Sequence, residues 1–88
     1  MGAYQVDFEP RAFREVRRLP QHHVGRIMDR IRGLATEPRP PGCEKLRGPD
    51  NSWRIRAGDY RVVYRVDDAA RVVTIARVGH RRDVYRER

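Results

Sequence analysis

The spacing of apolar residues changes along this chain, and that change limits the folds open to it. Between residues 9 and 36, apolar side chains recur every three or four positions, which is typical of amphipathic helices. Between residues 53 and 78 they recur mostly at every second position, which is typical of strands. Helices followed by a run of strands indicate the α+β class, with the helices packed on one face of a small sheet.

The predicted order is one strand, two helices and then four strands in an antiparallel meander. Pro10 suits the first turn of the first helix, and Leu19-Pro20 ends it because a residue before proline disfavours the helical conformation. The helical hairpin then leads through a proline-rich loop into the meander. The expected strands cover 3–8, 44–48, 53–57, 60–66 and 71–78, the expected helices cover 10–19 and 21–36, and the loop covers 37–43.

Two further expectations concern the end of the chain and its extent. The uniformly apolar run 71–78 predicts a strand covered on both sides, and Gly79 is expected to end it. The chain has 88 residues, so we expect one domain over residues 1–88.

Positive charge limits the partners of this chain. Lys and Arg number 20 against 12 Asp and Glu, a net charge of +8, and Lys45 is the only lysine. Such an excess favours a polyanion such as nucleic acid, and guanidinium groups suit phosphates. The lone Cys43 builds no intramolecular disulfide. Without an apolar run of ~20 residues or a signal peptide, the expectation is a cytoplasmic protein with no membrane partner, cofactor or metal.

Strand alternation predicts a cationic sheet face. If Trp53 and Ile55 face the helices, Arg54 and Arg56 face away from them. The following strand, with its alternate apolar residues inward, adds Arg61 and Arg65 to that outer face, where an anion would relieve repulsion between like charges.

Four segments in this order resemble the RelE branch of the RelE/ParE toxin superfamily, and the resemblance covers roughly residues 3–86. These segments are Lys45-Leu46-Arg47-Gly48, Trp53-Arg54-Ile55-Arg56, Gly58-Asp59-Tyr60-Arg61-Val62-Val63-Tyr64 and Val78-Gly79-His80-Arg81-Arg82-Asp83-Val84-Tyr85. The resemblance implies a RelE-like toxin of a type II toxin–antitoxin system. Such toxins cleave mRNA in the ribosomal A site, and a RelB-like antitoxin protein neutralises them.

The resemblance also implies which residues act. The two basic positions of the third strand correspond to Arg54 and Arg56, the hairpin arginine to Arg61, the arginine after the last strand to Arg81, and the C-terminal tyrosine to Tyr85. Further RNA contacts are expected from Lys45, Arg47, Arg65 and Arg82.

The implied chemistry is attack of the RNA 2′-hydroxyl on the adjacent phosphate, without a metal. Arg61 and Arg81 would clamp the phosphate, since a guanidinium fork fits two of its oxygens. Some family members carry lysines where this chain has Arg54 and Arg56, and arginine effectively never loses its proton. Tyr85 or His80 therefore remains to transfer protons.

Two alternatives stay open at this point. ParE-type toxins share the fold but inhibit DNA gyrase, and fold alone does not separate the two activities. A non-catalytic module that binds RNA or the ribosome would show the same basic face. His22 and His23 receive no role.

Overall fold

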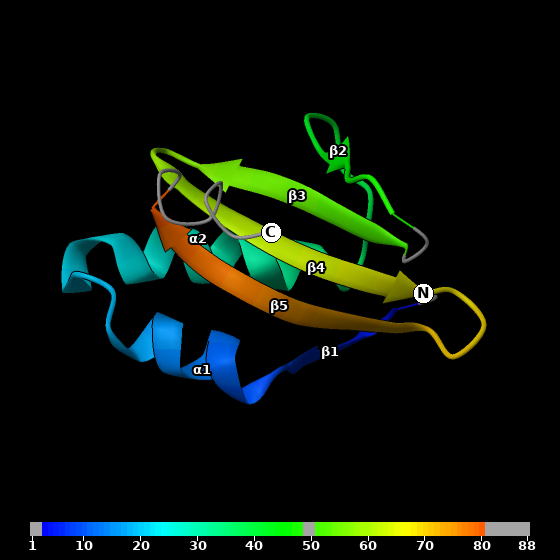
Figure 1. Cartoon of the computed structure of the whole chain (residues 1–88), viewed down its shortest axis with the longest axis horizontal. Coiled ribbons are helices and arrows are strands. Elements are labelled where there is room, and N and C mark those ends of the chain that lie inside the picture. The colour runs from blue at the N-terminus through cyan, green and yellow to red at the C-terminus, as the bar shows by residue number, and fades with distance from the viewer. Residues whose placement is uncertain (1–2, 49–50, 81–88) are drawn as a thin grey trace.

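The computed structural model describes residues 3–48 and 51–80. The predicted α+β class and order of elements are confirmed (Figure 1). The elements are β1 (Gln5–Phe8), α1 (Pro10–Arg17), α2 (Gln21–Gly33), β2 (Glu44–Lys45), β3 (Ser52–Ala57), β4 (Tyr60–Asp67) and β5 (Val72–His80).

The five strands form one mixed sheet in the order β1-β5-β4-β3-β2. Strands β2 to β5 are the predicted antiparallel meander. The first strand joins its far edge, where β1 runs parallel to β5 with Gln5 opposite Val72 and Phe8 opposite Ile75. The first and the last strand of the chain are therefore neighbours at one side of the sheet.

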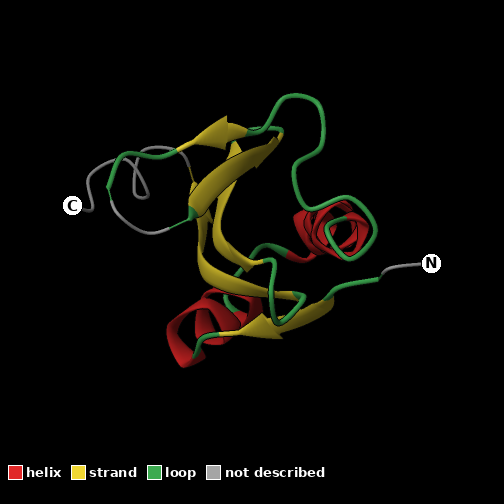
Figure 2. Ribbon diagram, turned by 90° about the vertical axis from the view of Figure 1, so that its right-hand side faces the viewer, coloured by secondary structure: helices red, strands yellow, loops and turns green. Residues whose placement is uncertain are grey.

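The core lies between α2 and the sheet. Ile27, Ile31 and Leu34 of the α2 segment are at most 1% exposed. They pack with the inward residues of the central strands, which include Ile55, Val62, Tyr64, Val73 and Ile75. Figure 2 shows the sheet curving around α2. In Figure 2 the other helix, α1, lies across the sheet from α2, beside β5.

Helix α1 lies along β5, beyond the end of the edge strand β1 (Figure 1). Its buried residue, Ala12, belongs to the same core. Beyond Phe8, β5 has no further β1 residue to pair with, and the Glu15 carboxylate accepts a hydrogen bond from the backbone N–H of Val78 at 2.7 Å. A side chain of α1 thus replaces a strand at this edge.

The elements begin or end one to three residues away from the predicted bounds. Helix α2 stops at Gly33, because Leu34, Ala35 and Thr36 donate to carbonyls three residues back, which tightens the last turn. Strand β2 has two residues only. Gly79 does not end β5, since the ladder continues through the pairs Arg61–Gly79 and Tyr60–His80.

A β-bulge in β5 accounts for the departure of its apolar residues from strict alternation. Val63 pairs with Arg77 and Tyr64 with Ile75, so Ala76 is an extra residue in this strand. The bulge keeps both Ile75 and Val78 on the core side. Val72, Thr74 and Arg77, on the outer side, are only partly buried. The expectation of a strand covered on both sides was therefore wrong.

Hydrogen bonds hold the loop that precedes β2 against the sheet at two points. The Tyr64 hydroxyl donates to the Pro38 carbonyl at 2.6 Å, and burial raises the pKa of Tyr64. The Arg39 guanidinium donates two hydrogen bonds to the Asp68 carboxylate, at 3.2 and 2.7 Å. This loop therefore has a defined path despite its prolines.

Candidate functional site

The predicted cationic face exists on the side of the sheet away from α2. Ile55 on β3 and Val62 on β4 are almost completely buried, so their neighbours in the sequence point outward. The outward residues include Arg54, Arg56, Arg61 and Arg65, with Arg77 following on β5. We call these five residues the arginine face.

Carboxylates partner three members of the arginine face. Arg54 pairs with Glu44 on the neighbouring strand β2. Arg65 pairs with Glu9 at 2.7 Å, and Arg77 with Glu15 at 3.0 Å. These partners come from three separate segments of the chain, and they reduce the positive charge over most of the face.

Two arginines of the face meet at one end of the sheet. Arg56 lies directly opposite Arg61 in the β3–β4 hairpin. Arg56 is exposed and, within residues 3–48 and 51–80, makes no ion pair. Two like charges opposite each other destabilise a hairpin, so an anion at this end would be bound favourably.

Arg61 is less accessible than the sequence suggested. It is 5% exposed, although the outer face was expected to be open to phosphates along its whole length. Gly79, on the other side of Arg61, presents no side chain to it. Burial holds the guanidinium in one place, which favours directed contact with one ligand group over general attraction of a polyanion.

His80 does not join the arginine face. It pairs with Tyr60 across the β4–β5 ladder, and the residues next to them, Gly79 and Arg61, belong to the outer side. The His80 ring lies edge-on to the Tyr60 ring, with 5.6 Å between centroids. Tyr60 in turn lies 4.9 Å from the ring of His23 on α2, which marks this as the α2 side of the sheet.

The other predicted residues are spread over the molecule. Lys45 lies 5.6 Å above the Trp53 ring, and Arg47 is exposed in the loop after β2. Arg65, as described above, is paired with Glu9. Arg81, Arg82 and Tyr85 lie outside the described residues. The predicted set therefore divides into an Arg56–Arg61 pair and several separate positions.

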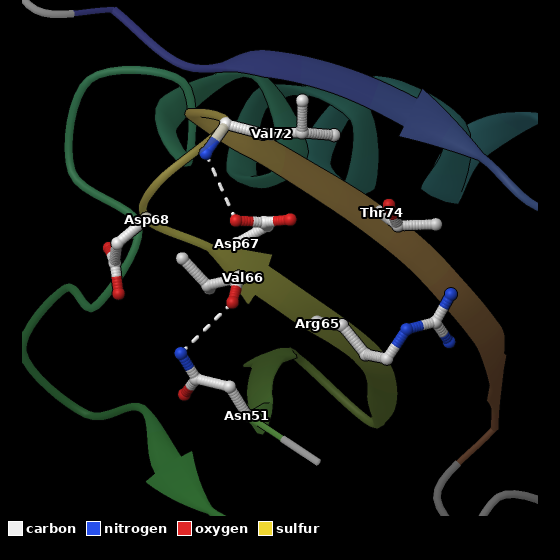
Figure 3. A pocket seen from close by; sticks show the side chains of 8 residues that line it. Asn51, Arg65, Val66, Asp67, Asp68, Val72 and Thr74 are labelled. Carbon is white, nitrogen blue, oxygen red and sulfur yellow. Dashed lines mark hydrogen bonds between the residues drawn. The ribbon is translucent and has the colours of Figure 1, made fainter.

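A hollow of about 600 Å³ occupies the opposite end of β4 (Figure 3). Its lining combines Asn51, Arg65, Asp67, Asp68 and Thr74. Hydrogen bonds from Arg39 and from the Tyr4 hydroxyl lower the pKa of Asp68, so this carboxyl is charged at neutral pH. Two carboxylates at this rim disfavour a phosphate, and the hollow lacks the charge of the Arg56–Arg61 end.

Sequence reasoning missed the carboxylates that partner the arginine face and the ring cluster around Tyr60. The ring cluster could have been anticipated only by continuing the strand through Gly79, which puts His80 beside Tyr60. In the described ranges, no three His, Cys, Asp or Glu side chains converge as metal ligands would. No helix in these ranges is long and apolar enough to cross a membrane.

Comparison with known proteins shows the family to which this chain belongs. The family described as "ParE toxin of type II toxin-antitoxin system, parDE" matches residues 6–85. Toxin RelG of Mycobacterium tuberculosis is 36% identical over 84 residues, which cover 94% of this chain and 97% of RelG. The mRNA interferase toxin RelE of Escherichia coli is 35% identical over 89 residues, covering 97% of this chain and 93% of RelE.

The fold agrees as well. A chain in the crystal structure of the toxin–antitoxin complex RelBE2 from Mycobacterium tuberculosis superposes with a TM-score of 0.78 and 32% identity, covering 89% of this chain and 91% of that one. The sequence matches cover nearly all of this chain and nearly all of each relative. The structural match covers most of the described fold. This chain belongs to the RelE/ParE toxin superfamily and is a RelE-like toxin of a type II toxin–antitoxin system.

Proposed function

We propose that this toxin is an endoribonuclease that cuts mRNA, most effectively in the ribosomal A site, and thereby stops translation. The observation that carries the proposal is the Arg56–Arg61 pair, a concentrated positive charge at one end of the arginine face. The E. coli relative named an mRNA interferase supports it, being similar over nearly the whole chain. A RelB-like antitoxin is the proposed protein partner, because a relative was crystallised as a RelBE complex.

The proposed reaction is an internal transesterification of RNA. The 2′-oxygen attacks the adjacent phosphorus, its proton passes to a base, and the 5′-oxygen leaves after accepting a proton. Negative charge grows on the phosphoryl oxygens in the transition state. Arg61 and Arg81 bind those oxygens, while Arg54 and Arg56 hold the neighbouring phosphates. This scheme uses side chains alone.

Tyr85 is the proposed proton-transfer residue. Arginines 54 and 56 keep their protons at any working pH, so they supply charge and not general-base catalysis. A tyrosine surrounded by guanidinium groups has a lower pKa than free tyrosine, because the positive field favours phenolate. His80 is the alternative, and its ring lies edge-on to that of Tyr60 on the side of the sheet away from the arginine face.

A second function has one observation in its favour. The matching family is described by its ParE members, so the alternative activity, inhibition of DNA gyrase, also has support in the sequence. The two activities differ in what they require of the arginine face. Cleavage needs cations at fixed distances from one phosphate, whereas gyrase binding does not need that arrangement.

Primer extension on an mRNA translated in a purified system tests the proposal. We expect new cuts within ribosome-occupied codons, and a decrease in cleavage rate of about 10²- to 10³-fold in Arg61→Ala, since loss of one preorganised donor has that effect. Arg32→Ala is the matched control, because it removes a guanidinium paired with Asp29 on the exposed side of α2. Tyr85→Phe and His80→Phe identify the proton-transfer residue.

Intact mRNA with normal translation would refute ribonuclease activity. A supercoiling assay with purified DNA gyrase would then decide the alternative. Inhibition of supercoiling that persists in the Arg61→Ala variant would identify the chain as a gyrase inhibitor.

A further inference from the structure

A second hollow lies at the same end of the sheet as Arg61, between the end of β5 and the connection from α1 to α2. Its volume is about 250 Å³. The rings of Tyr60 and His80 line it from the sheet, and Arg18, Leu19 and Pro20 line it from the connection between α1 and α2. Of its lining residues, the reaction described above involves only His80, as the alternative proton-transfer residue.

The two rings are arranged so that a third flat group can join them. Tyr60 and His80 meet edge to face, with an interplanar angle of 76°. The Tyr60 ring also lies 4.9 Å from the ring of His23, so a ligand would meet the ring surface that these contacts leave uncovered. Both residues are only partly buried, so ring surface remains accessible within the hollow.

The charges around the hollow suit a nucleotide. Its carboxylate, Glu15, is engaged by Arg77 at 3.0 Å and by the Val78 N–H at 2.7 Å. Arg18 at the rim is exposed and, among the described residues, makes no ion pair. Arg14 and Arg17 line a shallow depression together with Arg18 along α1. A flat ring pair bordered by guanidinium groups matches a base together with its phosphate.

The hollow and the Arg56–Arg61 pair are connected through the backbone. Tyr60 immediately precedes Arg61, and His80 immediately follows Gly79, which lies opposite Arg61. Neighbouring residues in a strand point to opposite faces. A single strand of RNA whose phosphate binds Arg61 on the outer face can therefore turn around this end of the sheet and reach the hollow with a flanking base.

We propose that this hollow binds an unstacked nucleobase of the RNA substrate, next to the nucleotide at which the chain is cut. The inference rests on the proposed ribonuclease function for its choice of ligand. One of the two rings stacks on the base while the other meets its edge, and Arg18 contacts its phosphate. His80 is then a positioning and specificity residue, not a proton-transfer residue.

The test uses a short 2′-O-methyl RNA, which lacks the attacking hydroxyl, with 2-aminopurine at one position at a time. Stacking quenches 2-aminopurine fluorescence, so quenching at one position marks the base in the hollow. Tyr60→Leu and His80→Leu should abolish that quenching and weaken binding about 5- to 150-fold, the range for losing one base–aromatic stack. Tyr60→Phe and His80→Phe keep a ring, so these variants should retain most of the quenching and most of the binding affinity.

An abasic nucleotide at the quenched position provides a test that needs no protein variant. It should weaken binding to the wild-type toxin as much as the leucine substitutions do. Equal binding of abasic and intact oligonucleotides at every position would overturn the proposal, as would unchanged quenching in folded leucine variants. Ring-dependent quenching in a toxin that never cuts RNA would support the hollow while refuting the ribonuclease.

Discussion

The arginines of the outer face share one chemistry but differ in their neighbours. Arg54, Arg65 and Arg77 each have a carboxylate partner, whereas Arg56 is exposed and Arg61 is buried beside a glycine. Position in the strand sets which face each guanidinium occupies. Contacts from distant segments then decide how much of its charge is left for a ligand.

Asp68 gives a prediction at the scale of one residue. Because hydrogen bonds from Arg39 and Tyr4 lower its pKa below the ordinary 3.8, the ionised form stabilises the fold above that pH. This contribution is lost as the pH falls through the lower folded-state pKa. Asp68→Asn should therefore reduce the free energy of unfolding at pH 7, and the difference from wild type should shrink below about pH 4. Urea unfolding over this pH range measures it.

The Arg39→Gln background is the control for that experiment. With the principal partner removed, Asp68→Asn should have a smaller effect at pH 7. A difference between wild type and Asp68→Asn that stayed constant from neutral to acid pH would contradict the assigned cause.

Between elements, one side chain joins α1 to the edge of the sheet. Glu15 binds both the Arg77 guanidinium and the Val78 N–H, and both side chains of the ion pair are mostly shielded from water, at 21% and 15% exposure. Glu15→Ala should lower the free energy of unfolding by about 1–3 kcal/mol, because it leaves these donors without their acceptor. Chemical denaturation gives this quantity.

Asp29→Ala is the matched comparison for Glu15. It also removes a helical carboxylate with an arginine partner, but that pair is 67% and 77% exposed. Such exposed pairs contribute little, so the loss should stay within about 0.5 kcal/mol. Equal losses in the two variants would show that Glu15 does not anchor α1.

The elements themselves were largely predictable because their causes are local. Alternation and helical spacing located β3, β4 and α2, and proline marked the start of α1. The parallel pairing of β1 with β5 has no local signal, since it depends on which sheet edge remains open after the meander forms. The bulge at Ala76 likewise follows from packing, because it brings Val78 back to the core.

The candidate site was likewise predictable where it depends on local sequence and not where it depends on distant segments. Alternation correctly assigned Arg54, Arg56, Arg61 and Arg65 to one face. His80 was a candidate for proton transfer because Arg54 and Arg56 keep their protons, and the direction of its side chain follows only from the ladder that continues past Gly79. The partners Glu9, Glu15 and Glu44 could not be found from spacing, since they lie on other elements.

At the scale of the whole molecule, the net charge of +8 predicts binding to RNA that weakens with salt. Each arginine that contacts a phosphate contributes about one unit to the slope of log K against log salt. Arg56→Ala should therefore reduce that slope by about one, whereas Arg32→Ala, with the same change in net charge, should leave it nearly unchanged. Titration of a non-cleavable RNA between about 50 and 200 mM salt measures both slopes.

The result for these two variants separates local from general attraction. Equal decreases in slope would mean that the toxin attracts RNA through its total charge alone. A decrease confined to Arg56→Ala would assign a phosphate contact to the Arg56–Arg61 end of the sheet.

The pairing of β1 with β5 also governs when this toxin becomes complete during its own synthesis. Residues 5–8 have their partners at residues 72–75, so the sheet cannot close until nearly the whole chain has left the ribosome. Pairing over so long a separation is slow, because a large loop must close first. The order of strands therefore makes the pairing of β1 with β5 a late step in the folding of the nascent toxin.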